Sequence, residues 1–355
     1  MNIARSARPS RRWTRFLSTP ALEPLALIYQ GSGNPAEVLS LVPVELPALG
    51  EADVAVEMIA APINPADINM VEGSYPIAPP VPAVGGNEGV GRVTAVGAGV
   101  RNLAVGDLVI PRLPAWGTWR THAVSPADKL MRVPPGLPAV AAATLAVNPC
   151  TALRMLEDFV GLSSGDVVVQ NGANSAVGQA VIQIARSRGI RTVNIVRCRP
   201  GHEEVIQRLE ELGGDVVTTD AGVRRAVAAA GLPRARLALN MVGGASAASA
   251  AKMLEDGGTL VTYGGMSRQP AHIPTGLLIF KDIRARGFWL SRWVEENSVE
   301  ERYRMFEQLQ PLVASGQLTL RTRGFHINNF RAAVAHATST GGTDEKAILL
   351  LQERE

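Results

Sequence analysis

Residues 166–188 read DVVVQNGANSAVGQAVIQIARSR, and this stretch decides the fold. An apolar run of valines predicts a buried strand, and the residues after the turn are apolar at helical spacing until Gly189. A turn of small residues between strand and helix lets backbone N–H groups approach a pyrophosphate. Ala173 and Ser175 replace two glycines of the usual fingerprint, so the turn alone also fits a βα connection without a ligand.

The same alternation of short apolar runs and helical stretches continues to about residue 287. Strands that alternate with helices predict a doubly wound parallel sheet with helices on both faces. We therefore predict a nucleotide-binding domain over 147–287. Its first helix should begin at Asn148, a plausible N-cap, with Pro149 in the first helical position.

The chain has a different texture on either side of this unit. Residues 23–146 are rich in Pro and Gly and carry short alternating strands, which predicts a small β-rich, barrel-like domain. After residue 287 we expect one helical stretch at 300–315 and a last strand at 347–351. Residues 288–355 should thus return to the first domain, so that the nucleotide-binding domain is an insertion.

Two arginines stand where a cofactor's 2′ position would lie. The second predicted strand ends at Val196 and is followed by Arg197, Cys198 and Arg199, with no acid before Glu203. NAD-binding folds place an Asp or Glu there for the ribose hydroxyls, whereas guanidinium groups pair with a 2′-phosphate. The sequence therefore predicts NADPH as cofactor, and two solvated surface arginines are the alternative.

The first 22 residues differ from the rest of the chain. They hold five arginines and several serines but no acid, and the first carboxylate is Glu23. Without those five arginines, 30 basic residues face 32 acidic ones. Such a leader is typical of a mitochondrial transit peptide, with a disordered basic start as the alternative. The near-neutral body gives no indication of nucleic-acid binding through a basic face.

The composition excludes several other classes of protein. Hydrophobic residues make up 46% of the 355 residues, which is ordinary for a globular chain with a sizeable core. No apolar run approaches the ~18 residues that span a bilayer. Cys150 and Cys198 are the only cysteines, and the five histidines form no His-x-x-x-His pair, so we expect no metal enzyme.

Eight stretches of the chain are long and distinctive. They are NPADINMVEGSY (64–75), PAVGGNEGVG (82–91), GTWRT (117–121), VNPCTALRML (147–156), NSAVGQAVIQIA (174–185), RLALN (236–240), VTYGGM (261–266) and LIFKDIRARGFWLS (278–291). In these stretches the chain resembles the medium-chain dehydrogenase/reductase superfamily, and within it the mitochondrial 2-enoyl thioester reductases. The resemblance covers roughly residues 25–351. Ala176 departs from it, since a Gly is usual there.

The resemblance implies an α/β fold in which a Rossmann cofactor domain is inserted in a GroES-like catalytic domain. It also implies a homodimer without zinc. Zinc-dependent relatives carry Gly-His-Glu after an upstream Cys, but this chain has Gly86-Asn87-Glu88 and no Cys before Cys150. We expect Glu88 to be a structural carboxylate and Cys150 a packed helix residue.

The implied reaction is the NADPH-dependent reduction of a trans-2-enoyl thioester, carried by acyl carrier protein or CoA, in mitochondrial fatty acid synthesis. The resemblance assigns Tyr75 as proton donor, and a phenol can protonate an enolate at neutral pH. Trp289 fits either the acyl site or the core. The resemblance implies cofactor contacts from Asn148, Asn174, Ser175, Ala176, Val177, Arg197, Arg199, Tyr263, Gly264, Gly265, Met266, Phe288, Trp289, Leu290, Ser291 and Lys346.

Two other functions remain open at this point. A zinc-independent NADPH:quinone reductase would share the fold but would not need Tyr75 as an acid. An NADPH-binding redox sensor or transcriptional cofactor would bind the dinucleotide without turnover. The acyl chain length, the carrier and the transit-peptide cleavage site are not predicted by the sequence.

Overall fold

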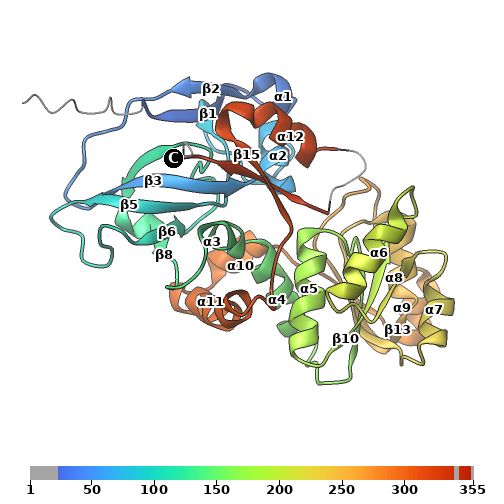
Figure 1. Ribbon diagram of the computed structural model, residues 1–355. Coiled ribbons are helices and arrows are strands. Elements are labelled where there is room, and N and C mark those ends of the chain that lie inside the picture. Colours follow the sequence, from blue (N-terminus) through green and yellow to red (C-terminus); the bar gives the residue numbers. More distant parts are fainter. Residues whose placement is uncertain (1–22, 340–343, 353–355) are drawn as a thin grey trace, which may run out of the picture.

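The computed structural model describes residues 23–339 and 344–352, so the predicted transit peptide at 1–22 lies outside the described residues. The chain forms two lobes (Figure 1). One lobe is built on mainly antiparallel strands from both ends of the chain, and the other on a parallel sheet from its middle. This is the predicted α/β architecture, a GroES-like lobe with a Rossmann lobe inserted in it.

The inserted lobe holds a six-stranded sheet in the order β11-β10-β9-β12-β13-β14, and all of its strand pairs are parallel. In chain order this is the 3-2-1-4-5-6 arrangement of dinucleotide-binding folds. The order reverses between β9 and β12, which is where such sheets bind ligands. The strands are β9 (Val167–Asn171), β10 (Arg191–Val196), β11 (Val216–Thr219), β12 (Ala235–Asn240), β13 (Leu254–Thr262) and β14 (Arg284–Gly287).

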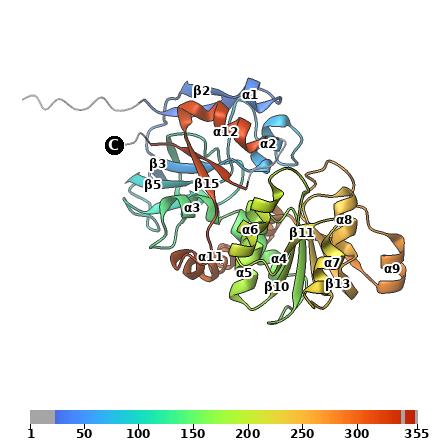
Figure 2. The same cartoon turned by 45° about the vertical axis from the view of Figure 1, so that its right-hand side comes forward.

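Helices cover both faces of this sheet, because its central strands are apolar on both sides. Val168 packs towards α4 and α5, whereas its neighbours Val167 and Val169 pack into the opposite cluster, which includes residues of α7 and α8. Figure 2 shows the two helical layers with the sheet between them. The helices are α4 (Asn148–Glu157), α5 (Ala176–Ser187), α6 (His202–Glu211), α7 (Val223–Ala229), α8 (Gly244–Ala251) and α9 (Thr275–Lys281).

The first lobe contains a seven-stranded sheet and a small three-stranded one. The long strand β3 alternates buried and half-buried residues, as expected of a sheet with one face in the core. The large sheet comprises β3 (Asp53–Pro62), β5 (Val90–Val96), β6 (Leu108–Pro111), β7 (His122–Pro126), β8 (Leu130–Arg132), β15 (Thr322–His326) and β16 (Lys346–Leu350). The small sheet comprises β1 (Leu25–Tyr29), β2 (Ser40–Pro43) and β4 (Ala83–Val84), and α1 (Pro35–Val38) and α2 (Pro65–Glu72) belong to the same lobe.

The chain returns to the first lobe after residue 287, but with more structure than predicted. The expectation of a single helical stretch there was wrong. A short α10 (Leu290–Glu296) precedes α11 (Val299–Ala314), and α12 (Phe330–Ala337) follows β15. The two additional helices are only seven and eight residues long, too short for a clear helical periodicity in the sequence. The last strand, β16, pairs with β3.

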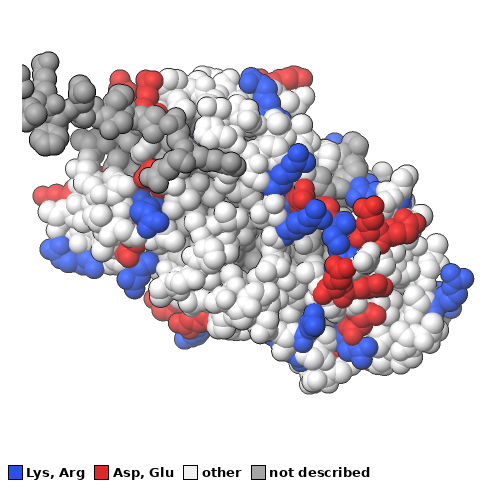
Figure 3. All heavy atoms as spheres, viewed as in Figure 1, with Lys and Arg blue, Asp and Glu red and all other residues white. Residues whose placement is uncertain are grey.

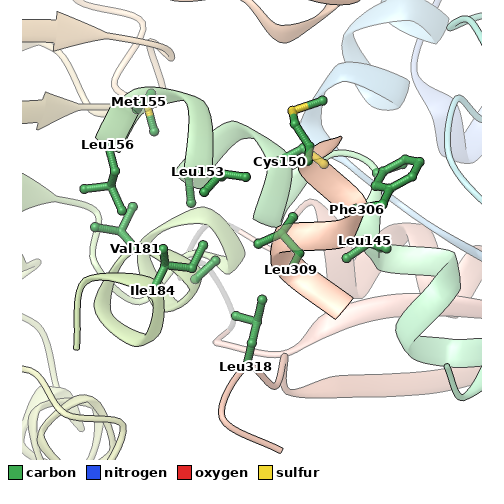
Figure 4. Packing of buried hydrophobic residues seen from close by; sticks show 14 of the residues in the cluster. Leu145, Cys150, Leu153, Met155, Leu156, Val181, Ile184, Phe306, Leu309 and Leu318 are labelled. Atoms are coloured by element: carbon green, nitrogen blue, oxygen red, sulfur yellow. The ribbon is translucent and has the colours of Figure 1, made fainter. Parts of the chain in front are cut away.

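The two lobes share one hydrophobic core. Figure 4 shows α4 and α5 packed against α3 (Ala139–Leu145) and α11. Cys150 and Phe306 are fully buried there, so Cys150 is the packed helix residue that the sequence predicted. Burial in this apolar contact raises the pKa of its thiol to about 12. The lobes are therefore joined by side-chain packing as well as by the chain itself.

The face of the molecule in Figure 3 carries both acidic and basic side chains, which gather most densely over the inserted lobe around α5 and α6 and beside its junction with the first lobe. Among the described residues, no single helix has the length and apolarity to cross a membrane. Only α3 and α4 taken together meet that measure, and they are bent by 48° at their junction.

Candidate active site

A cleft of about 300 Å³ lies at the carboxyl ends of the parallel strands, between the two lobes. Its walls come from the βα turn after β9, the end of β10 and the segment that leads into β16. Seven of the predicted cofactor residues line it, namely Asn174, Ser175, Ala176, Arg197, Arg199, Met266 and Lys346. The cleft lies beside the point where strand order reverses, as expected for a dinucleotide site.

The turn before α5 is shaped for close approach to a ligand. The hydroxyl of Ser175 accepts a hydrogen bond from the backbone N–H of Gly178 at 3.1 Å and so caps the helix. A Cβ on Gly178 would lie 2.5 Å from the carbonyl oxygen of Ala173, so only glycine allows this helix–strand approach. Val177 faces the core instead of the cleft. The remaining N–H groups of the first turn are available to a phosphate.

The two arginines after β10 lie at one end of the cleft. Arg197 and Cys198 are exposed, and Arg199 is half-buried. The backbone carbonyl of Arg199 accepts hydrogen bonds from the N–H and the ring Nδ1 of His202, so the chain turns directly into α6. This arrangement places two guanidinium groups beside the turn that would hold the pyrophosphate, where they fit a 2′-phosphate.

Buried asparagines hold the strand ends in place, and sequence reasoning did not identify them. Asn171 donates its side-chain amide hydrogen to Asn240 at 2.8 Å, and its carbonyl oxygen accepts the N–H of Met241 at 2.9 Å. Asn240 in turn donates to the hydroxyl of Thr262 at 3.1 Å. These bonds tie β9, β12 and β13 together at the edge that faces the cleft. Polar residues at the ends of apolar strands were the signal that could have predicted them.

The loop after β13 carries Tyr263, Gly264, Gly265 and Met266. Gly264 packs closely over the backbone of Met241, whereas Gly265 is exposed. The hydroxyl of Tyr263 is buried, and the side chain of Ser175 in the turn before α5 lies close enough to lower its pKa slightly against the effect of burial. Burial raises the pKa of Tyr263, so this hydroxyl stays protonated. This hydroxyl therefore lies beside Ser175, a residue of the turn that lines the cleft.

Tyr75 and Trp289 come from segments far apart in the sequence and contact each other. The indole Nε1–H of Trp289 donates to the hydroxyl oxygen of Tyr75 at 2.7 Å. The two rings pack edge to face, with centroids 5.9 Å apart. Both side chains are half-buried, and Tyr75 follows α2 closely in the first lobe. Because its oxygen already accepts a hydrogen bond, the phenol keeps its own proton for another acceptor.

The residues around Trp289 have mainly packing contacts. The backbone N–H of Phe288 donates to the carbonyl of Thr262 at 3.0 Å, and its ring packs edge to face on Phe159. Leu290 packs against the shared core, and Ser291 is half-buried in the first turn of α10. These contacts place the segment beside β13, with Trp289 turned towards Tyr75.

Asn148 does not cap α4. It is the first residue of the helix, Val147 precedes it as the cap residue, and its side-chain amide donates to Asn64 at 3.2 Å. Lys346 donates to the same Asn64 oxygen at 2.7 Å. The N-cap prediction for Asn148 was therefore wrong, because a polar partner beside α2, distant in sequence, takes its side chain.

Zinc-dependent relatives have metal ligands in the segment that reads Gly86-Asn87-Glu88 here. In this chain the side chains of Asn87 and Glu88 make hydrogen bonds within the protein. Asn87 donates to Asp67 at 2.6 Å and accepts the N–H of Ala115 at the same distance. Glu88 is buried and accepts from Asn64 and from the N–H of Val147. Within residues 23–339 and 344–352, no three His, Cys, Asp or Glu side chains gather as a metal site. Burial raises the pKa of Asp67 to about 6 and of Glu88 to about 7.

The fold and the cleft define a two-domain dehydrogenase or reductase of the alcohol dehydrogenase type that binds NADP(H). Residues 50–135 match the alcohol dehydrogenase GroES-like domain family, and residues 176–308 match the zinc-binding dehydrogenase family. The second name describes the family, whereas the described part of this chain has no such cluster of ligands.

Known proteins narrow the class. The chain is 50% identical over 297 residues to the mitochondrial enoyl-[acyl-carrier-protein] reductase of Rattus norvegicus, covering 83% of this chain and 80% of that protein. It is 44% identical over 354 residues to the protein of that name in Arabidopsis thaliana, covering 98% and 94%. The structure of Etr1p with NADP and crotonyl-CoA matches with a TM-score of 0.85 at 32% identity, over 93% of this chain and 100% of that one. The chain belongs to the mitochondrial enoyl-[acyl-carrier-protein] reductase family, which confirms the resemblance seen in the sequence.

Proposed function

We propose that this protein reduces trans-2-enoyl thioesters to saturated acyl thioesters with NADPH, as a step of mitochondrial fatty acid synthesis. The observation that carries the proposal is the hydrogen bond from Trp289 to the hydroxyl oxygen of Tyr75. Because this bond uses a lone pair of the oxygen, the phenolic O–H remains available as a donor. Tyr75 can therefore give its proton to an oxygen or a carbon of the substrate. An acid of that kind suits an enolate.

NADPH, when bound, supplies a hydride for the β-carbon of the enoyl thioester. The turn at Asn174, Ser175 and Ala176 would hold its diphosphate, and Arg197 and Arg199 its 2′-phosphate. Tyr263, Gly264, Gly265, Met266 and the segment from Phe288 to Ser291 would surround the nicotinamide end, together with Asn148 and Lys346. We assign these residues from their lining of the cleft or their place beside it.

Tyr75 then completes the reduction by protonating the α-carbon of the enolate. Positioned general acids are worth about 100- to 10,000-fold in rate. Trp289 holds the phenol in place and covers one side of it. With no zinc ligands grouped among the described residues, stabilisation of the developing negative charge falls to hydrogen-bond donors such as this phenol.

The test follows NADPH oxidation with trans-2-hexenoyl-CoA for the wild-type chain and for Tyr75→Phe. We expect a loss of at least about 100-fold in the variant. Tyr303→Phe is the matched control, because within the described residues its hydroxyl accepts a single hydrogen bond, from the backbone N–H of Arg132 at 3.2 Å. Good quinone reduction without enoyl turnover would overturn the proposal in favour of a quinone reductase. Tight NADPH binding without either turnover would favour a non-catalytic sensor.

We also propose that residues 23–146 and 288–355 form the catalytic domain and residues 147–287 the cofactor domain. The order of strands supports this division, since β9 to β14 form one sheet and both ends of the chain contribute to the other. Mitochondrial targeting by residues 1–22 follows from the sequence argument above. Import of the full chain into isolated mitochondria, against a chain that starts at Glu23, would test it.

Finally, we propose a homodimer formed through β14 and α9. The strand β14 ends the parallel sheet, all four of its residues are exposed, and among the described residues no strand pairs with its outer edge. Leu278, Ile279 and Phe280 of α9 are exposed by 44%, 66% and 82%. An unpaired edge beside an exposed apolar helix fits a second copy of this chain. Light scattering should give a dimer for the wild type and a monomer for Phe280→Glu, and a monomeric wild type would refute the proposal.

A further inference from the structure

A buried polar cluster connects distant segments of the chain at the junction of the lobes. Asn64 lies directly before α2, Glu88 precedes β5, Asn148 begins α4, and Lys346 begins β16. The first three are almost inaccessible, with exposed fractions of 4%, 2% and 5%. Lys346 also lines the cofactor cleft. Our mechanism so far uses Asn148 and Lys346 but gives no task to Asn64 or Glu88.

The hydrogen bonds of this cluster fix the direction of every donor. The carbonyl oxygen of Asn64 accepts from Lys346 Nζ at 2.7 Å and from the Asn148 amide at 3.2 Å. Its own amide nitrogen donates to Glu88 Oε2 at 2.9 Å, and Glu88 Oε1 accepts the N–H of Val147 at 2.8 Å. An ammonium group can only donate, so the Asn64 amide cannot turn over without placing its nitrogen against that donor. Both oxygens of Glu88 must therefore act as acceptors, which requires the ionised carboxylate.

The orientation of Asn148 follows from this chain of bonds. Its amide nitrogen is taken by Asn64, and no donor among the described residues contacts its carbonyl oxygen. That oxygen is thereby left to a donor from outside the protein. The carboxamide N–H₂ of a nicotinamide is such a donor, and Asn148 shares its partner oxygen on Asn64 with the cleft-lining residue Lys346.

We propose that Glu88 is a positioning residue for the cofactor: through Asn64 and the N–H of Val147 it fixes the Asn148 amide with its oxygen towards the nicotinamide carboxamide. The inference rests on the proposed function, because it takes NADPH as the cofactor. It revises the expectation that Glu88 is only a structural carboxylate. A carboxylate that merely filled a turn would not need to control the orientation of two amides.

The electrostatics of the cluster make this role depend on pH. Burial raises the pKa of Glu88 to about 7, the charge of Lys346 on β16 opposes that rise, and Asp67 on α2 adds to it. The charge of Glu88 also acts on Arg302 of α11 and on the thiol of Cys150 on α4. Protonated Glu88 would turn one acceptor oxygen into a donor and break the bond to Asn64 or to Val147. The affinity for NADPH should accordingly fall below about pH 7.

Two single variants and their combination test the role without relying on turnover. Glu88→Gln has nearly the same shape, but one of its two contacts becomes donor against donor. Asn64→Asp places a second carboxylate against Glu88. In the double variant, the introduced glutamine donates to the introduced aspartate, which still accepts from Lys346 and Asn148, and the Val147 bond returns. The double variant thus makes the same hydrogen bonds as the wild type, except that residue 88 now donates to residue 64.

We expect each single variant to bind NADPH at least about 10-fold more weakly in a fluorescence titration, the effect of losing a hydrogen bond to a charged group. The double variant should recover to within about threefold of wild type. The pH below which NADPH affinity falls should be lower in the double variant than in the wild type. The three donors that face the introduced aspartate favour its ionised form. The phosphate of the cofactor titrates in the same way with the wild type and with the double variant. A difference between their curves of NADPH affinity against pH therefore reports the titration of Glu88.

Glu157→Gln at the far end of α4 is the matched control, because the ion pairs of Glu157 in the described part of the chain are with Arg154 and Arg188, outside the cluster. Wild-type affinity in both single variants would overturn the inference, and so would a double variant weaker than either. If a single variant does not fold, the inference is tested by the NADPH affinity of the wild type measured against pH. If this affinity falls over the same pH range as that of the double variant, the role of Glu88 is refuted. Inactivity towards enoyl thioesters alongside this binding pattern would refute the proposed function alone.

Discussion

Replacement of Trp289 by Phe isolates the hydrogen bond that positions the proposed acid. The change removes the Nε1–H that donates to Tyr75 at 2.7 Å but keeps an aromatic ring for the edge-to-face contact. A hydrogen bond between neutral groups contributes about 0.5–1.5 kcal/mol net. If that stabilisation acts on the transition state, kcat/KM for trans-2-hexenoyl-CoA should fall roughly 2- to 12-fold. The affinity for NADPH should change less, because the introduced Phe keeps an aromatic ring at the position beside the nicotinamide end.

A double-mutant cycle shows whether this loss passes through Tyr75. In a Tyr75→Phe background no hydroxyl remains for the indole to bind, so Trp289→Phe should have little further effect on kcat/KM. The coupling between the two sites should then equal nearly the whole single-variant loss. Steady-state rates of NADPH oxidation for the four proteins supply the numbers. An equal loss in both backgrounds would refute the reasoning and leave Trp289 as a packing residue.

Three further predictions test other parts of the site. Replacing Arg197 and Arg199 by Ala should raise the KM for NADPH by roughly 10- to 150-fold and leave that for NADH nearly unchanged; an equal rise for both cofactors would argue against a 2′-phosphate site. Ser175→Ala removes the cap of α5 and should lower the free energy of unfolding in urea by about 1 kcal/mol, whereas no change would mean that the cap bond adds nothing. Burial raises the pKa values of Asp67 and Glu88 to about 6 and 7, so the stability that comes from their protonation is complete below their ordinary pKa values of 3.8 and 4.5 and is lost as pH rises to 7. Urea melts of the wild type and of a Glu88→Gln variant should show the greater loss over this range in the wild type.

The fold could be predicted because its signals are local. The run from 166 to 188 contains a strand, a turn and a helix in immediate succession, and the same pattern repeats along the sheet. The regions that were missed, α10 and α12, are short helices of the returning chain that pack against cores built by residues distant in sequence. Periodicity cannot identify elements of seven or eight residues, because two turns give too few apolar positions.

The sequence predicts the parts of the candidate site that directly follow strands better than the parts that depend on contacts between distant residues. The turn at Asn174 to Ala176 and the arginines after β10 follow strands directly, so the sequence places them at one sheet edge, and the structure lines the cleft with them. Asn171 and Asn240 are 69 positions apart, and Asn64 and Lys346 are 282 apart. Amides in such pairs look like ordinary polar residues until the chain is folded, since nothing nearby in sequence specifies their partners.

Glu88 links the buried hydrogen-bond cluster to the binding of the cofactor. The cluster around Asn64 needs the ionised carboxylate, yet burial favours the protonated one and raises its pKa to about 7. Stability and cofactor orientation therefore make opposite demands on one group: unfolding is hardest where Glu88 is protonated, whereas NADPH should bind best where it is charged. A protein selected for stability alone would place an uncharged residue in this interior. A carboxylate between Val147 and Asn64 is what we expect if the position serves to hold Asn148, and the opposite pH dependences of folding and NADPH affinity are its measurable consequence.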